Sequence, residues 1–422
     1  MIDRFISPET TNVFNIHIPS VKVCQCSDVP LYRIDGGVQP LIKLDVFFQA
    51  GDAWANNALI PNFTNALVLE STKKHTSHEL AEALDFMGAE INPLNGSKYS
   101  CFSLISLTKY FPDAIKILTE MLNEPLFSEE DFVVYRNNMK KQFFVDIQDV
   151  SYQARRYFKA LLFGKEHPYG KIVDENDFDF IVPEQLKDYF TRLYHKKNVQ
   201  LFISGDMNNE VLNILNRHFT LMDGTFPHFN LPSVVASSSM SRTIKMEHAI
   251  QSAIRIGKTV IPKSHPDYPA LQIATTVLGG YFGSRLMQVL REEKGYTYGV
   301  GTALVNYDEI SYFVVATEVA KEATYDAINC IYHEIDKLCT EEISSTEMEN
   351  VRSYLLGEFL RSMDGPFNIM ETYKAVHNIN LTMEYYTYYL DVLTHIQPRK
   401  ILEVANRYLV NDFIEVIAGD IE

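Results

Sequence analysis

The hydrophobic and polar positions of this chain follow two periods, one typical of strands and one of helices. Residues 42–48 alternate apolar and polar side chains in part, and residues 99–107 do so more strictly, which predicts two strands. Residues 80–87 place apolar side chains at helical spacing, and Gly88 then predicts the end of that helix. Residues 115–122 predict a second amphipathic helix in the same way.

Residues 199–204 form a short apolar run that predicts a buried strand, and Gly205 and Asp206 close it with a turn. Predicted strands therefore neighbour one another along the chain, and the predicted helices each have one apolar face. This pattern is typical of an α+β domain, in which helices cover one face of a sheet.

An internal repeat is the clearest sign of domain organisation in the chain. Landmarks of the first half recur in the second half in the same order, at offsets of 213 to 216 residues. The paired landmarks are Asp113 and Asp326, Ser128 and Ser344, Arg136 and Arg352, Pro183 and Pro398, Arg192 and Arg407, and Gly205 and Gly419. So many matches at nearly one spacing predict two copies of one unit.

The segment between the copies, residues 226–241, is uncharged and rich in proline and serine, which is typical of a linker. We therefore predict an N-terminal domain over residues 1–225, a linker over residues 226–241 and a C-terminal domain over residues 242–422. Each predicted domain has a length that is usual for a single domain.

The composition excludes several classes of protein. With 46% hydrophobic and 22% charged residues, the chain resembles an ordinary globular protein and neither a disordered nor a collagen-like one. Its 38 basic and 54 acidic residues give a net charge of −16, which argues against nucleic acid or an anionic membrane as the main partner. Five widely spaced cysteines favour reduced thiols, and the N-terminus lacks a secretory signal, so a soluble cytoplasmic protein is expected.

Runs of residues in both copies carry a resemblance to a known family. The first copy has STKKHTSHEL at residues 71–80 and GAEIN at residues 88–92. The second copy has LRE at residues 290–292 and GYTY at residues 295–298. In this order the chain resembles the pitrilysin/insulinase metallopeptidases (inverzincins), a family that includes the mitochondrial processing peptidase. The resemblance covers nearly the whole chain and implies two tandem homologous domains, each a mostly antiparallel sheet packed with helices.

Active members of that family bind zinc through H-x-x-E-H, in which two histidines hold the metal and the glutamate activates its water. The resemblance places this motif at residues 62–66, where the chain has Asn62, Asn65 and Ala66 at the three functional positions. It places the third ligand, a glutamate, near Lys141 and Gln142. Alanine cannot bind a metal ion and lysine repels one, so we expect neither a zinc site nor a general base in this chain.

The run from His75 to Glu79 contains two histidines and a glutamate that resemble a ligand cluster. Thr76 and Glu79, however, have the spacing of a capping box that opens the following helix. His75 would then precede the helix and His78 would lie in its first turn, so the two histidines would not share a face. We predict a helix cap here and no metal site.

The second copy keeps a different pair of residues. In the family, the Leu-Arg-Glu and Gly-x-x-Tyr motifs supply an arginine and a tyrosine that reach the substrate, and here these are Arg291 and Tyr298. Both can donate hydrogen bonds to a peptide carbonyl and to the oxyanion formed from it. Without the resemblance, Arg291 would be an exposed helix residue and Tyr298 a packed strand residue. The glycines within residues 279–283 predict a flexible turn that a substrate backbone can approach.

These residues predict a non-catalytic, substrate-binding subunit of a heterodimeric zinc metallopeptidase. Its expected partners are a homologous zinc-containing peptidase chain and a peptide, with zinc in the partner and no cofactor in this chain. Two alternatives remain open, because relatives without zinc also serve as structural core subunits of respiratory complexes, and metal ligands could have moved elsewhere in the chain. An acidic chamber would favour basic peptides through its field.

Overall fold

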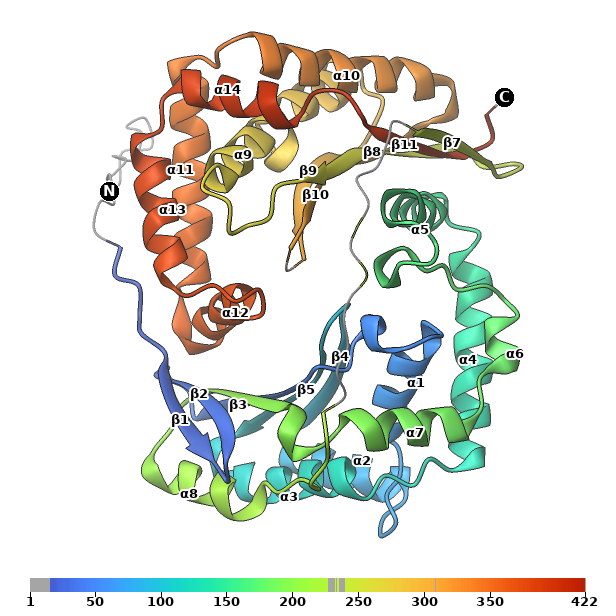
Figure 1. Ribbon diagram of the computed structural model, residues 1–422, viewed down its shortest axis with the longest axis vertical. Helices are drawn as coiled ribbons and strands as arrows, with labels where there is room; N and C mark the ends of the chain where they lie inside the picture. The colour runs from blue at the N-terminus through green and yellow to red at the C-terminus, as the bar shows by residue number, and fades with distance from the viewer. Residues whose placement is uncertain (1–15, 227–231, 233, 235–239, 308, 422) are drawn as a thin grey trace, which may run out of the picture.

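The chain forms two halves, each built on one β-sheet, and the two halves face each other (Figure 1). The computed structural model describes residues 16–226, 232, 234, 240–307 and 309–421. Sheets and helices are mixed in both halves, so the predicted α+β class is confirmed. None of the helices in the described part of the chain combines the length and apolar character that a membrane-spanning helix needs.

The first half contains a six-stranded sheet with the strand order β1-β2-β6-β3-β5-β4. Neighbouring strands are antiparallel, except that β2 and β6 are parallel. The strands are β1 (Lys22–Cys26), β2 (Val29–Asp35), β3 (Leu41–Phe48), β4 (Glu90–Asn95), β5 (Ser100–Leu107) and β6 (Val199–Gly205). The strands predicted at residues 42–48, 99–107 and 199–204 are confirmed as β3, β5 and β6.

The second half contains a five-stranded sheet with the order β7-β11-β8-β10-β9. Here β7 and β11 are parallel, and the other neighbours are antiparallel. The strands are β7 (Met240–Lys245), β8 (Gln251–Val260), β9 (Val300–Asn306), β10 (Ser311–Ala320) and β11 (Ile414–Gly419). Strand for strand, this sheet repeats the order and direction of the first sheet without β1.

The helices of the first half follow from amphipathic patterns and local caps. They are α1 (Leu59–Val68), α2 (Ser77–Met87), α3 (Phe111–Asn123), α4 (Glu129–Asp146), α5 (Val150–Phe163), α6 (Asp177–Phe180), α7 (Pro183–Leu193) and α8 (Asn209–His218). The predicted cap of α2 is confirmed: Thr76 Oγ1 accepts from Glu79 N at 3.3 Å, and the Glu79 carboxylate accepts from Thr76 N at 2.8 Å. Gly88 ends α2 with φ of 59°.

The helices of the second half are longer on average than those of the first half. They are α9 (Tyr268–Thr275), α10 (Thr324–Thr340), α11 (Ser345–Ser362), α12 (Gly365–His377), α13 (Glu384–His395) and α14 (Pro398–Tyr408). In Figure 1, α10 and α14 lie on the side of the second sheet that faces away from the first half, and α2 and α3 lie on the outer side of the first sheet.

One helix of each half is exchanged with the other half. Helix α5 of the first half packs against the second sheet, where Ala154 and Phe158 share a core cluster with Val314 and Val416. Helix α12 of the second half packs in the same way against the first sheet, through Ile369 and Met370. Figure 1 shows both helices in the space between the two sheets. The two halves therefore cover each other's inner sheet faces.

Most of the predicted linker, residues 226–241, lies outside the described residues, so its boundaries and those of the two domains stay a prediction. Phe226 is described and its ring meets Trp54 at a centroid distance of 5.0 Å. The Pro232 carbonyl lies 3.0 Å from His167 Nε2. Met240, which the prediction places in the linker, instead begins strand β7.

Candidate functional site

The residues that the resemblance assigns to zinc lie on helix α1. The Asn57 side chain accepts a hydrogen bond from Leu59 N at 2.8 Å just before the helix begins. Asn62 and Ala66 are four residues apart and therefore share one helix face, on which Asn62 is exposed and Ala66 half-buried. Asn65, at the position of the family glutamate, is only 2% exposed and lies in the core.

A buried polar network holds Asn65 in place. Tyr194 Oη donates a hydrogen bond to Asn65 Oδ1 at 2.5 Å, and Asn65 Nδ2 donates to Ser100 Oγ at 3.0 Å. The Ser100 hydroxyl donates in turn to the Ala50 carbonyl. Both ends of the Asn65 amide are therefore used in joining α1 to strand β5 and to the end of α7.

Asn65→Ala is expected to lower the free energy of unfolding by about 1–3 kcal/mol, because Tyr194 and Ser100 would keep buried polar groups without their present partner. Denaturant titration followed by circular dichroism measures the change. Asn62→Ala is the matched control, since it removes an exposed amide from the same helix and should change stability by less than about 0.5 kcal/mol. Equal effects of the two substitutions would contradict the structural role of the network.

Arg291 and Tyr298 lie together in the second half, with Phe282 as a third member of the cluster. The guanidinium carbon of Arg291 is 4.8 Å from the centroid of the Tyr298 ring and 5.0 Å from that of the Phe282 ring. Tyr298 is 89% exposed, and Phe282 is exposed too. Among the described residues, Arg291 forms an ion pair with its neighbour Glu292 alone, at 3.5 Å. Two aromatic rings thus orient the guanidinium of a side chain that is 30% exposed.

Contacts on both sides of this cluster fix its backbone. Arg285 forms a two-pronged ion pair with Glu347 of α11, at 2.8 and 3.0 Å. On the other side, the Thr317 hydroxyl of β10 donates to the Gly299 carbonyl at 3.0 Å. Tyr298 consequently projects from an anchored segment, and the interpretation of this tyrosine as a packed strand residue is wrong.

The sequence predicts a flexible turn over residues 279–283, and the structure has a turn at Phe282 and Gly283, while Gly279 and Gly280 end a π-helical segment. Residues Thr276–Gly280 and Met287–Glu293 are π-helical segments, η5 and η6, and Arg291 lies on η6. A Cβ atom on Gly279 would lie 2.5 Å from Thr302 Cγ2, so this glycine lets η5 pack closely against strand β9. Phe282 lies in the turn between the two segments. The sequence does not indicate a role for it, because one aromatic residue in a turn forms no periodic pattern. π-Helical segments are rare and frequent at functional sites.

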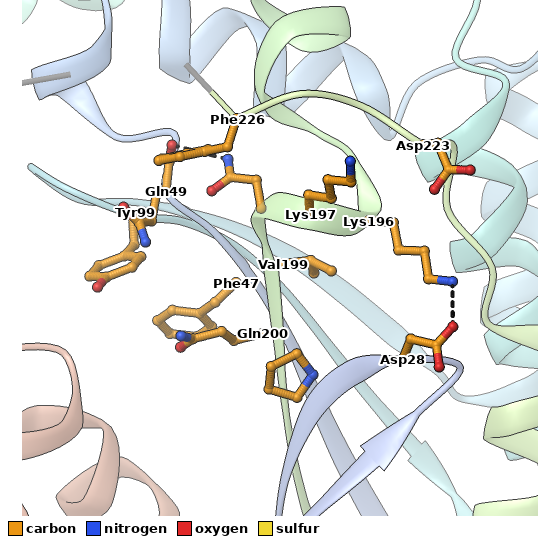
Figure 2. Close-up of a pocket in the computed structure, with 12 residues that line it drawn as sticks. Asp28, Phe47, Gln49, Tyr99, Lys196, Lys197, Val199, Gln200, Asp223 and Phe226 are labelled. Atoms are coloured by element: carbon orange, nitrogen blue, oxygen red, sulfur yellow. Dashed lines mark hydrogen bonds and ion pairs between the residues drawn. The ribbon is translucent and has the colours of Figure 1, made fainter. Parts of the chain in front are cut away.

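A cavity of about 490 Å³ opens beside the first sheet (Figure 2). Phe47 and Tyr99 line it with rings whose centroids are 6.0 Å apart, and Gln200 contributes an amide. At another part of the wall, Lys196 forms an ion pair with Asp28 at 3.0 Å. Aromatic walls with a few polar groups are typical of ligand sites, and no motif in the sequence predicted this cavity.

Comparison with known proteins matches both halves of the chain to one peptidase family. A model described as Insulinase (Peptidase family M16) matches residues 43–157, and a model described as Peptidase M16 inactive domain matches residues 181–355. Together they cover more than half of the chain. The chain belongs to peptidase family M16.

M16 relatives differ in their stated activity. An uncharacterized zinc protease of Mycobacterium bovis is 23% identical over 319 residues, which are 74% of this chain and 73% of the relative. The non-peptidase homolog YmxG of Helicobacter pylori is 22% identical over 399 residues, which are 92% of this chain and 88% of the relative.

Solved structures show the same fold over nearly the whole chain. The M16 inactive domain from Pseudomonas fluorescens matches with a TM-score of 0.86 and 20% identity, covering 96% of this chain and 99% of that one. A protease from Helicobacter pylori matches with a TM-score of 0.84 and 16% identity, covering 96% of this chain and 100% of that one. The predicted membership of this family, as a half-size chain, is therefore confirmed.

Zinc is the metal that M16 membership implies, and the residues of this chain do not fit it. Asn62, Asn65 and Ala66 offer neither imidazole nor carboxylate, and both ends of the Asn65 amide are already bonded. Lys141 and Gln142 on α4 are exposed. Among the residues that the structure describes, no group of three or more His, Cys, Asp or Glu side chains could hold a metal ion. The chain is consistent with a non-catalytic member of M16.

Proposed function

We propose that this M16 chain is the non-catalytic, substrate-binding subunit of a heterodimeric zinc metalloendopeptidase whose partner carries H-x-x-E-H. One observation carries the proposal: half-buried Arg291 and exposed Tyr298 lie together, while helix α1 offers neither histidine nor carboxylate for a metal. A tyrosine side chain as exposed as Tyr298 contributes little to folding, so its presence beside Arg291 supports contact with another molecule.

In the assembled enzyme, the partner supplies zinc and the general base, and this chain supplies hydrogen-bond donors. The guanidinium of Arg291 and the phenol of Tyr298 donate to carbonyl oxygens of the bound peptide. Donors that are held in place before substrate arrives stabilise the negative charge that develops on such an oxygen. The Phe282 ring contacts the same guanidinium and helps to keep it oriented.

An extended peptide is the substrate that the sheets suit best. Strand β4 lies at the edge of the first sheet, and an edge strand can pair its outer backbone groups with an added strand. Strand β4 also contacts helix α1, which carries the former metal positions. A peptide that pairs with β4 would therefore run past the place where active M16 members hold their metal.

A peptidase assay tests the proposal with three samples: the purified chain, a homologue from the same cells that carries H-x-x-E-H, and their mixture. We expect no cleavage by the chain alone with added Zn²⁺, and cleavage by the mixture above that of the homologue alone. A homologue with the motif glutamate replaced by glutamine is the control for the mixture. Robust zinc-dependent cleavage by this chain alone would contradict the proposal.

A further inference from the structure

The two sheets differ at one equivalent position on the faces that the exchanged helices cover. In the first sheet, Asp45 of β3 lies opposite Phe202 of β6. In the second sheet, Arg255 of β8 lies opposite Val416 of β11. Because β3 and β8, and likewise β6 and β11, hold the same places in the two sheet orders, Asp45 and Arg255 are equivalent. A carboxylate in one half corresponds to a guanidinium in the other.

Each exchanged helix brings a lysine to this position. Helices α5 and α12 begin 215 residues apart, at Val150 and Gly365, and the same offset relates Lys159 to Lys374. Lys374 Nζ donates to Asp45 Oδ2 at 2.7 Å, so the first sheet has a paired lysine. In the second sheet, the position equivalent to Asp45 is occupied by Arg255, so Lys159 of α5 has no carboxylate there to pair with.

The charges around Lys159 and Arg255 repel one another. Burial lowers the pKa of Lys159, Asp52 opposes this shift, and the positive charges of Arg155 and Arg255 lower it further. Burial also lowers the pKa of Arg255, and Arg155 adds to the effect. The three cations therefore lie close enough together for each to make the charge of its neighbours less favourable.

None of these three cations forms an ion pair with any residue that the structure describes, and Arg255 Nε is buried there without a hydrogen-bond partner. Asp52 acts on Lys159 and Glu318 acts on Arg255 through their charges, but neither carboxylate comes within ion-pair distance. Asp52 Oδ1 instead accepts a hydrogen bond from Asn95 Nδ2 at 2.6 Å. Lys159 and Arg255 are half-buried, whereas Arg155 is exposed, and half-buried cations without an ion-pair partner cost free energy.

We propose that Arg155, Lys159 and Arg255 form a subsite for a carboxylate of the bound peptide, an inference that rests on the proposed function. A carboxylate from the peptide would supply the partner that Asp45 supplies in the other half. The planar guanidinium of Arg255 suits a two-pronged contact with it. The subsite lies where helix α5, which carries Arg155 and Lys159, packs against strand β8, which carries Arg255. This subsite selects a peptide carboxylate, in contrast to the basic side chains that the net charge suggests.

Two carboxylates of a peptide could enter the subsite, one from an acidic side chain and one from the C-terminus. Three fluorescent peptides of one sequence separate these sources: one with an internal glutamate and an amidated end, one with glutamine and a free C-terminus, and one with glutamine and an amidated end. Fluorescence anisotropy with the full chain gives the dissociation constants. We expect one of the first two peptides to bind at least about tenfold more tightly than the third.

Arg255→Gln and Lys159→Gln should each remove most of that preference and leave the affinity for the uncharged peptide unchanged. Lys116→Gln, which removes an exposed lysine of α3, is the control and should change nothing. Equal affinities of the three peptides for the unaltered chain would overturn the subsite and leave the proposed function intact. Failure of all three peptides to bind would overturn both.

Thermal unfolding provides a second, independent measurement. Lys159→Met removes one of the repelling cations, so the melting temperature should stay the same or rise. A clear fall would mean that Lys159 is held by contacts within the chain and would contradict the subsite.

Discussion

Replacing Lys374 with methionine is expected to destabilise the chain by about 3 kcal/mol. Lys374 and Asp45 have side chains that are 6% and 1% exposed, and their 2.7 Å contact joins helix α12 to strand β3 of the other half. Removing one partner of a buried ion pair costs about 3–5 kcal/mol, because the remaining charge stays buried and unpaired. The lower end applies here, since Lys43 lies 3.8 Å from Asp45 and compensates in part.

The charges around Lys374 support this expectation. Burial alone would lower the pKa of Lys374, but the charges of Asp45 and Glu371 outweigh burial and raise the pKa above its ordinary value. Glu371 accepts hydrogen bonds from Lys374 at 2.7 Å and from Lys43 at 2.6 Å. The lysine is thus charged in the folded chain and bound to two carboxylates.

Urea titration of the unaltered chain and of Lys374→Met measures the difference in free energy of unfolding. Lys159→Met is the matched control, because it makes the same change at the equivalent position of the other exchanged helix. Replacing both Asp45 and Lys374 by apolar residues should recover much of the loss, since no unpaired charge then remains at that contact. A double variant as unstable as Lys374→Met would show that packing, and not the charge pair, holds α12.

The second large effect concerns catalysis by the reconstituted pair of chains. Arg291→Ala should lower kcat/KM for peptide cleavage by roughly 10²- to 10³-fold, the usual consequence of losing one donor to a developing oxyanion. Tyr298→Phe keeps the ring beside Arg291 and removes one hydroxyl, so its effect should be smaller. Steady-state kinetics of the mixture with each variant measure both changes.

Arg399→Ala is the control for these variants, because it removes an exposed arginine of α14, far along the chain from residues 291–298. Binding of the two chains, followed by size-exclusion chromatography, should be the same for all variants. If Arg291→Ala combined with Tyr298→Phe left both assembly and cleavage unchanged, the role of a structural subunit would replace the proposed function.

The secondary structure that depends on local signals was predictable from the sequence. Strands β3 and β5 follow from alternation, and helix α2 follows from Thr76, Glu79 and Gly88, all of which act within a few residues of themselves. The exchange of α5 and α12 was not predictable in this way. An amphipathic pattern shows that a helix has an apolar face, but the pattern contains nothing about which of two similar sheets that face will cover.

In the candidate site, too, local features were predictable from the sequence and contacts between distant residues were not. The loss of metal ligands at Asn62, Asn65 and Ala66 is visible in the sequence, and so is the spacing of Arg291 and Tyr298. The role that Asn65 took instead depends on Tyr194, which is 129 residues away in the chain and could be assigned only from the structure. The exposed ring of Tyr298 likewise depends on how its flanking residues are anchored, which no linear pattern describes.

The exchanged helices also set the order in which the newly made chain can become stable. The first sheet is complete once β6 has left the ribosome, but α12, which covers its inner face, ends at His377. At about 5–20 residues per second, roughly 10 to 30 seconds of synthesis separate the two events. During that interval an apolar sheet face is open to solvent and to chaperones, and the first half reaches its final stability only after translation of the second.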